Sequence, residues 1–115
     1  MSTPEAGPPI ILVVEDIGWI RAGMARSLRR HGYRVAEAAD DDEAVEAVRR
    51  ERPDVILTEE QLPGFDELLA RVRDLPANLR APVAVVNPDA DEGTRYGDAV
   101  VLTDYAQLRT LMLRT

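Results

Sequence analysis

Candidate strands alternate with segments of helical periodicity along most of this sequence, and this alternation constrains the fold more than any other feature. The candidate strands cover residues 10–14, 33–38, 55–58, 82–86 and 99–102. Runs that are apolar almost throughout are typical of strands buried on both faces. Because strands that alternate with helices form parallel sheets with right-handed crossovers, the sequence predicts an α/β fold with a five-stranded parallel sheet.

Amphipathic segments follow four of the five candidate strands. They cover residues 18–31, 40–52 and 65–75, and a closing segment carries Tyr105, Leu108, Leu111 and Met112 on one side. After the fourth strand the pattern fails, because residues 88–98 contain two glycines and only Ala90 and Tyr96 as partly apolar positions. Three helical turns need about 11 residues with an apolar stripe. The fourth helix is therefore predicted to be shortened or missing.

Composition excludes several classes of function. All 14 basic residues are arginine, cysteine is absent and His31 is the one histidine, which excludes Schiff-base lysines, thiolate nucleophiles and sulfur-ligated zinc. The net charge of −7 argues against a nucleic-acid partner, and no apolar run is long enough to span a membrane. We expect a cytoplasmic protein with a flexible tail over residues 1–9 and one domain over residues 10–115.

Acidic residues stand where two apolar strands end. Glu15 and Asp16 follow the first strand, and Glu59 follows the third. In parallel sheets the functional crevice lies at the carboxyl ends of the strands, so these carboxyl groups are expected to share one pocket. Carboxylate oxygens are ligands for hard cations, which predicts weak Mg²⁺ binding. The alternative is that Glu15 points to solvent and one carboxyl group is protonated or hydrogen-bonded.

Three sequence segments together carry a specific resemblance to a known family. They are IILVVED, RRHGYRV and AADDDEAVEAVRRERPDVILTEEQLPGFDELLARVR, which run from Ile10 to about Val72. The chain thereby resembles a response-regulator receiver domain of the CheY-like type. The resemblance implies the flavodoxin-like strand order 2-1-3-4-5, with signalling through a two-component phosphorelay as the family's function.

The resemblance also implies positions for a phosphorylation site. Receivers accept a phosphoryl group on an aspartate that ends the third strand, and this position holds Glu59 here. Their Mg²⁺ ligands would correspond to Glu15, Asp16, Glu59 and the backbone carbonyl of Gln61. The extra methylene of glutamate displaces the accepting oxygens, and phosphoryl transfer tolerates little misplacement.

Other positions of this pocket depart from the family pattern. The family's serine or threonine corresponds to Asn87, its switch aromatic to Val101 and its lysine to Asp104. Two like charges about 4 Å apart repel by roughly 4 kcal/mol at an effective dielectric near 20, so Asp104 would oppose an added phosphoryl group. We therefore expect a degenerate receiver that does not undergo ordinary phosphotransfer, in which Glu59 is either a built-in mimic of the phosphorylated state or a remnant.

The expected function is an atypical single-domain response regulator without enzymatic activity. It would bind a protein partner, namely a sensor kinase, a regulator or a second copy of itself. The predicted contact face comprises Val101, Tyr105, Leu108 and Met112, unless these residues only cover the sheet. One alternative is a receiver that is phosphorylated or metal-bound in a non-standard way at Glu15, Asp16 and Glu59. A more remote alternative is a small metal-dependent hydrolase.

Residues 40–42 are three aspartates that are expected to cap a helix rather than bind a metal.

Overall fold

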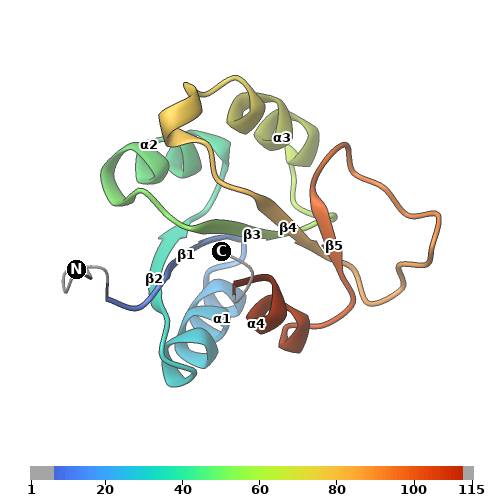
Figure 1. The fold of residues 1–115 in the computed structure, drawn as a ribbon, viewed down its shortest axis with the longest axis horizontal. Helices are drawn as coiled ribbons and strands as arrows, with labels where there is room; N and C mark the ends of the chain where they lie inside the picture. The colour runs from blue at the N-terminus through green and yellow to red at the C-terminus, as the bar shows by residue number, and fades with distance from the viewer. Residues whose placement is uncertain (1–6, 113–115) are drawn as a thin grey trace, which may run out of the picture.

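The computed structural model describes residues 7–112. Its elements in chain order are β1 (Ile10–Val14), α1 (Gly18–Arg30), β2 (Arg34–Ala38), α2 (Asp41–Glu51), β3 (Val55–Glu59), α3 (Phe65–Arg73), the 3-10 helix η2 (Ala77–Leu79), β4 (Val83–Val86), β5 (Val100–Leu102) and α4 (Ala106–Met112). All five strands are parallel and their order is β2-β1-β3-β4-β5 (Figure 1). The predicted α/β fold and strand order are confirmed.

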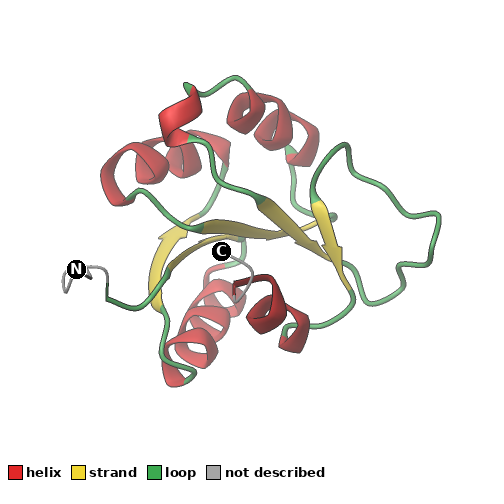
Figure 2. Cartoon of the chain, viewed as in Figure 1, coloured by secondary structure: helices red, strands yellow, loops and turns green. Residues whose placement is uncertain are grey.

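Helices cover both faces of this sheet. α2 and α3 pack on one face, and α1 and α4 pack on the other (Figure 2). Because side chains alternate along a strand, Leu12 and Val14 of β1 join the first core while Ile11 and Val13 join the second. All four side chains are buried, which explains why β1 is apolar throughout.

The three aspartates at residues 40–42 organise the start of α2. The Asp40 carboxylate accepts a 2.9 Å hydrogen bond from the backbone N–H of Glu43, so the predicted helix cap is confirmed. Asp41 and Asp42 both pair with the guanidinium of Arg71 on α3, and the distance from Arg71 Nη1 to Asp41 Oδ2 is 3.0 Å. These charges therefore hold α2 against α3.

No helix is present between β4 and β5, which confirms the prediction for this crossover. Residues 87–99 instead form a long loop, drawn in orange in Figure 1. Within it, the ring of Tyr96 meets the ring of Phe65 on α3 edge-on, with centroids 5.4 Å apart and an interplanar angle of 82°. Tyr96 thus supplies part of the cover that a helix would give to this end of the sheet.

The N-terminal end of the described chain modifies the prediction of a flexible tail over residues 1–9. Residues 1–6 of the predicted tail lie outside the described residues, whereas Pro8 and Pro9 lie along β2. Their carbonyl oxygens accept hydrogen bonds from Nε and the backbone N–H of Arg34, at 2.8 and 3.0 Å. Among residues 7–112, no helix combines the length and apolar character needed to cross a membrane.

Candidate functional site

The carboxyl ends of β1 and β3 bring the predicted acidic residues together. The two strands are neighbours, paired from Ile11 opposite Val55 to Val13 opposite Leu57. Glu15 directly follows β1 and is only 6% exposed, while Glu59 ends β3 and is half-buried. Asp16 is the exposed member of this carboxylate cluster, by which we mean Glu15, Asp16 and Glu59.

Glu15 does not point to solvent, and its surroundings favour the protonated carboxyl group. Burial raises the pKa of Glu15 to about 7, and contact with the carboxyl groups of Glu59 and Asp16 adds to the increase. One interaction acts the other way, because the backbone N–H of Ile17 donates a 3.0 Å hydrogen bond to Oε2 of Glu15 and so lowers the pKa. The structure thus brings the three carboxyl groups together, and that of Glu15 is partly protonated near neutral pH.

Arg21, a cation close to this cluster, is engaged elsewhere. Its Nη1 donates a 2.8 Å hydrogen bond to the backbone carbonyl of Glu15, and its Nε lies 3.4 Å from Oε1 of Glu37 on β2. None of the ion pairs within residues 7–112 includes a side chain of the carboxylate cluster. The negative charge of the cluster is therefore not balanced by an arginine partner.

Tyr105 lies within electrostatic reach of the same cluster. Burial of its hydroxyl, together with the negative charges of Glu59 and Glu15, raises the pKa of Tyr105 to about 12. The phenol therefore stays protonated at neutral pH. Sequence reasoning placed Tyr105 on a contact face and missed this position beside the carboxyl groups, because the relation depends on how α4 packs against α1.

The positions at which the resemblance places phosphoryl-binding groups have other partners in the structure. The amide of Asn87 donates to the hydroxyl of Tyr96 at 2.8 Å, and its carbonyl oxygen accepts from the N–H of Asp89 at 3.0 Å. The carboxylate of Asp104 accepts a 3.3 Å hydrogen bond from the backbone N–H of Gln107 at the start of α4. Val101 is half-buried in β5. The side chain of Asn87 is thus engaged within the 87–99 loop and that of Asp104 in a helix cap.

The cap on α4 is reciprocal, and the sequence contained a signal for it. The side-chain oxygen of Gln107 accepts a 2.7 Å hydrogen bond from the N–H of Thr103 while Asp104 accepts from Gln107. An acidic or hydroxyl residue followed three positions later by Glu or Gln is typical of a helix start. Reading Asp104 only as a replacement for lysine concealed this pattern.

The donor atoms at the carboxylate cluster suit a hard divalent cation. Glu15, Asp16 and Glu59 offer carboxylate oxygens, and Gln61 lies in the exposed turn that follows β3. The cluster is loosely gathered, however. Within the described residues, the one acidic trio whose oxygens all lie within 4.8 Å of one another is that of residues 40–42. Because Glu15 is partly protonated at neutral pH, a cation there would have to displace a proton.

The predicted contact face is wrong for two of its four residues. Leu108 and Met112 are buried in the core that α1 and α4 form against the sheet. They cover the sheet, as the alternative interpretation held. Tyr105 remains 40% exposed, and the other large apolar side chains at the surface are Ile17, at 43%, and Trp19, at 79%. Ile17 and Trp19 therefore place exposed apolar surface at the start of α1, beside the carboxylate cluster.

Comparisons with known proteins agree on one family. The family model of the response regulator receiver domain matches residues 11–98. The receiver domain of the sensor histidine kinase PA1611 from Pseudomonas aeruginosa, solved with a magnesium ion coordinated in its active site cleft, has a TM-score of 0.74 and 28% identity. That match covers 94% of this chain and 97% of the other. Vibrio cholerae chemotaxis response regulator CheY4 gives a TM-score of 0.73 at 25% identity, covering 94% and 99% of the two chains.

Curated relatives differ in how much of their length is matched. Sporulation initiation phosphotransferase F of Bacillus subtilis is 29% identical over 99 residues, which are 84% of this chain and 80% of that protein. Transcriptional regulatory protein AfsQ1 of Streptomyces coelicolor is 40% identical over 67 residues, which are 56% of this chain and 30% of that protein. The similarity to AfsQ1 is thus confined to a minor part of that longer protein.

Proposed function

Because this chain belongs to the response-regulator receiver family, we propose that it acts as an atypical receiver that binds a protein partner without being phosphorylated. The observation that supports this most directly is that the carboxylate of Asp104 accepts a hydrogen bond from the backbone of α4. A carboxylate that caps α4 occupies the position at which the resemblance places a phosphoryl-neutralising lysine. The chain contains no lysine that could substitute for it.

Electrostatics at the carboxylate cluster support the same proposal. A phosphoryl group carries close to two negative charges at neutral pH, and an acyl phosphate on Glu59 would replace the single charge of the carboxylate by these two. On Glu59 these charges would lie beside Glu15, whose raised pKa already reports unbalanced negative charge and burial. Arg21 cannot neutralise them without leaving Glu37 and the carbonyl of Glu15. Phosphorylation is therefore energetically opposed by the groups already present.

The proposed contact surface comprises Ile17, Trp19 and Tyr105. Trp19 is 79% exposed in the first turn of α1, and exposed aromatic side chains are enriched at the centres of protein interfaces. Ile17 lies beside the carboxylate cluster and Tyr105 is within electrostatic reach of Glu59 and Glu15, so a partner on this surface would sense their charge. The partner would be a sensor kinase, another regulator or a second copy of this chain.

We include weak Mg²⁺ binding at the carboxylate cluster in this proposal, and no catalytic activity. Glu15, Asp16, Glu59 and the carbonyl of Gln61 would hold the ion, which would lower the mutual repulsion of the carboxyl groups. A hydrolase would also need a positive group to stabilise a transition state, and none of the described ion pairs brings one to the cluster.

Phosphodonor treatment followed by intact-mass measurement tests the proposal. We expect no adduct after incubation with acetyl phosphate and Mg²⁺. A stoichiometric gain of about 80 Da, the mass of a phosphoryl group, that disappears in Glu59→Gln would overturn it. Incubation with a purified sensor kinase and ATP, followed by the same mass measurement, tests phosphoryl transfer from a protein donor. Glu60→Gln is the matched control, because Glu60 is the exposed neighbour of Glu59.

The contact surface has a separate test. The measurement is binding to a purified kinase or regulator, or self-association by light scattering. Trp19→Ala is expected to weaken it at least tenfold, since the loss of an interface aromatic side chain commonly costs about 2 kcal/mol of binding free energy. Arg26→Ala on the exposed side of α1 is the control. Equal binding by wild type and Trp19→Ala would exclude this surface.

A further inference from the structure

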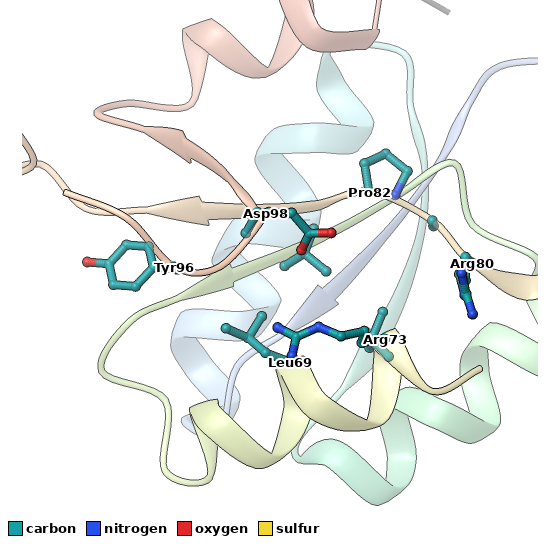
Figure 3. A pocket seen from close by; sticks show the side chains of 10 residues that line it. Leu69, Arg73, Arg80, Pro82, Tyr96 and Asp98 are labelled. Carbon is teal, nitrogen blue, oxygen red and sulfur yellow. The ribbon is translucent and has the colours of Figure 1, made fainter. Parts of the chain in front are cut away.

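A cavity lies at the amino ends of β4 and β5, whereas the carboxylate cluster lies at the carboxyl ends of the strands. It has a volume of about 310 Å³ and is bounded by α3, the segment that leads into β4 and the end of the 87–99 crossover (Figure 3). Leu69, Val72, Val83 and Ala99 contribute apolar walls. Pockets for small ligands begin at about 300 Å³ and are mostly apolar with a few polar groups. This cavity therefore has the size and walls of a small-ligand site.

The cavity results from the missing helix. A helix between β4 and β5 would pack on this end of the sheet, whereas the crossover contributes mainly the ring of Tyr96, seated against Phe65. Tyr96 and Ala99 pack against the core of α2 and α3 but are only partly buried. Space that a helix would fill is thus left open between α3 and the loop.

Two arginines without acidic partners stand at this cavity. Within residues 7–112, the side chain of Arg73 forms neither an ion pair nor a hydrogen bond. Its guanidinium lies against the loop at Gly97, where an added Cβ atom would lie 3.0 Å from Nη2 of Arg73. Arg80 is anchored through Nε, which donates a 2.9 Å hydrogen bond to the carbonyl of Leu75. Its terminal nitrogens have no partner in the described part of the chain.

The lining carries a net positive charge in a chain whose formal charge is −7. Asp98 is the one acidic residue in the lining, so Arg73 and Arg80 leave an excess of one positive charge. Figure 3 shows the Asp98 carboxylate directed toward the guanidinium of Arg73, and the ion pairs within residues 7–112 include no pair between these two groups. A ligand with a single negative charge would balance this site.

We propose that this cavity binds a small organic carboxylate with an apolar body. The guanidinium of Arg73 would pair with the carboxylate, for which its planar donor geometry is suited, and Arg80 would add to the attraction. The body would occupy the apolar space between Leu69 and Ala99. The proposal does not depend on the proposed function, because it uses the amino ends of the strands.

A titration of the full chain with 2-naphthoate, followed by backbone amide NMR, tests the proposal. We expect saturable shifts confined to residues 69–73, 80–83 and 96–99, with a Kd below about 1 mM. The uncharged 2-naphthamide has nearly the same shape and is expected to bind at least tenfold more weakly. Shifts that do not saturate, or equal affinity for the amide, would overturn the proposal.

Charge variants separate this site from general attraction to the surface. Arg73→Gln is expected to weaken naphthoate binding at least tenfold, and it removes no contact that holds the fold. Asp98→Asn is expected to tighten binding severalfold, because it removes the opposing charge. Arg49→Gln, on the exposed side of α2, is the matched control with no expected effect. Unchanged binding in Arg73→Gln, or an equal loss in Arg49→Gln, contradicts the proposal.

Discussion

The side-chain amide of Asn87 at the end of β4 donates a 2.8 Å hydrogen bond to the hydroxyl of Tyr96, nine residues further along the chain. The Tyr96 ring in turn meets Phe65 of α3. One tyrosine therefore ties both ends of the crossover to the sheet and to α3. Asn87 stands where the resemblance places a phosphoryl-binding hydroxyl, and this tie employs its amide instead.

Removing the Tyr96 hydroxyl is expected to lower the free energy of unfolding by about 0.5–1.5 kcal/mol in Tyr96→Phe, the usual contribution of one hydrogen bond. Tyr96→Ala also loses the ring contact with Phe65 and is expected to cost about 2 kcal/mol or more. Urea denaturation measures both. Tyr33→Phe is the control, since the Tyr33 hydroxyl forms no hydrogen bond with any residue from 7 to 112. A Tyr96→Phe protein as stable as wild type would contradict the role given to this bond.

The raised pKa of Glu15 predicts that stability falls as pH rises. The folded state binds a proton at Glu15 up to about pH 7, whereas the unfolded chain releases it near the ordinary value of 4.5. The contribution is therefore fully present below about pH 4.5 and is lost between there and pH 7, by about 1 kcal/mol or more. Asp16, Glu59 and Tyr105 are the titratable groups that face Glu15.

Glu15→Gln tests this pH dependence, because the amide keeps an acceptor for the N–H of Ile17 and cannot ionise. In urea titrations with EDTA at pH 5 and pH 8, the variant is expected to show a smaller loss of stability than wild type. Glu60→Gln, at an exposed position, should reproduce the wild-type slope. An identical slope in Glu15→Gln would show that Glu15 is not the group responsible.

The cap on α4 predicts a graded effect at Asp104. Asp104→Ala removes the acceptor for the N–H of Gln107 and is expected to cost about 0.5–2 kcal/mol. Asp104→Asn keeps an oxygen at the same place and is expected to stay within about 0.5 kcal/mol of wild type. Thermal unfolding by circular dichroism distinguishes them. If both variants lose equal stability, charge rather than capping is the cause.

Arg52 predicts a stabilising substitution. It follows α2 with φ of 52°, a left-handed conformation that glycine adopts with little strain. Arg52→Gly is therefore expected to raise the free energy of unfolding by up to about 1 kcal/mol. Arg49→Gly, inside the same helix, should instead lower it by about 1 kcal/mol. Denaturation midpoints of the pair provide the comparison, and a destabilised Arg52→Gly would refute the strain.

Strand positions could be predicted because burial on both faces leaves a direct mark on composition. The run Ile10–Val14 coincides with β1, and the missing apolar stripe over residues 88–98 correctly indicated the helix-free crossover. The adjacency of Glu15 and Glu59 followed from the rule that parallel strands end at one edge. Local pattern and sheet topology were sufficient for these features.

Features that depend on tertiary packing could not be predicted from the sequence. Leu108 and Met112 share one side of α4, and the same periodicity describes a buried face or a contact face. The packing of α4 against the sheet buries them. Likewise, the desolvation of Glu15 depends on the side chains around it, which no spacing in the sequence specifies. No sequence pattern indicated the contacts of Tyr96, because its partners Asn87, which follows β4, and Phe65, which begins α3, come together only in the folded chain.

The helix-free crossover also makes the chain divisible. Between Pro88 and Arg95 the backbone is stabilised mainly by its own turn, in which Asp91 accepts hydrogen bonds from Gly93 and Thr94. New termini or an inserted reporter peptide at this turn would interrupt no helix and no strand, and exposed turns of this kind tolerate insertion best. The two fragments would meet along the β4 and β5 pairing and could be used as a complementing split protein.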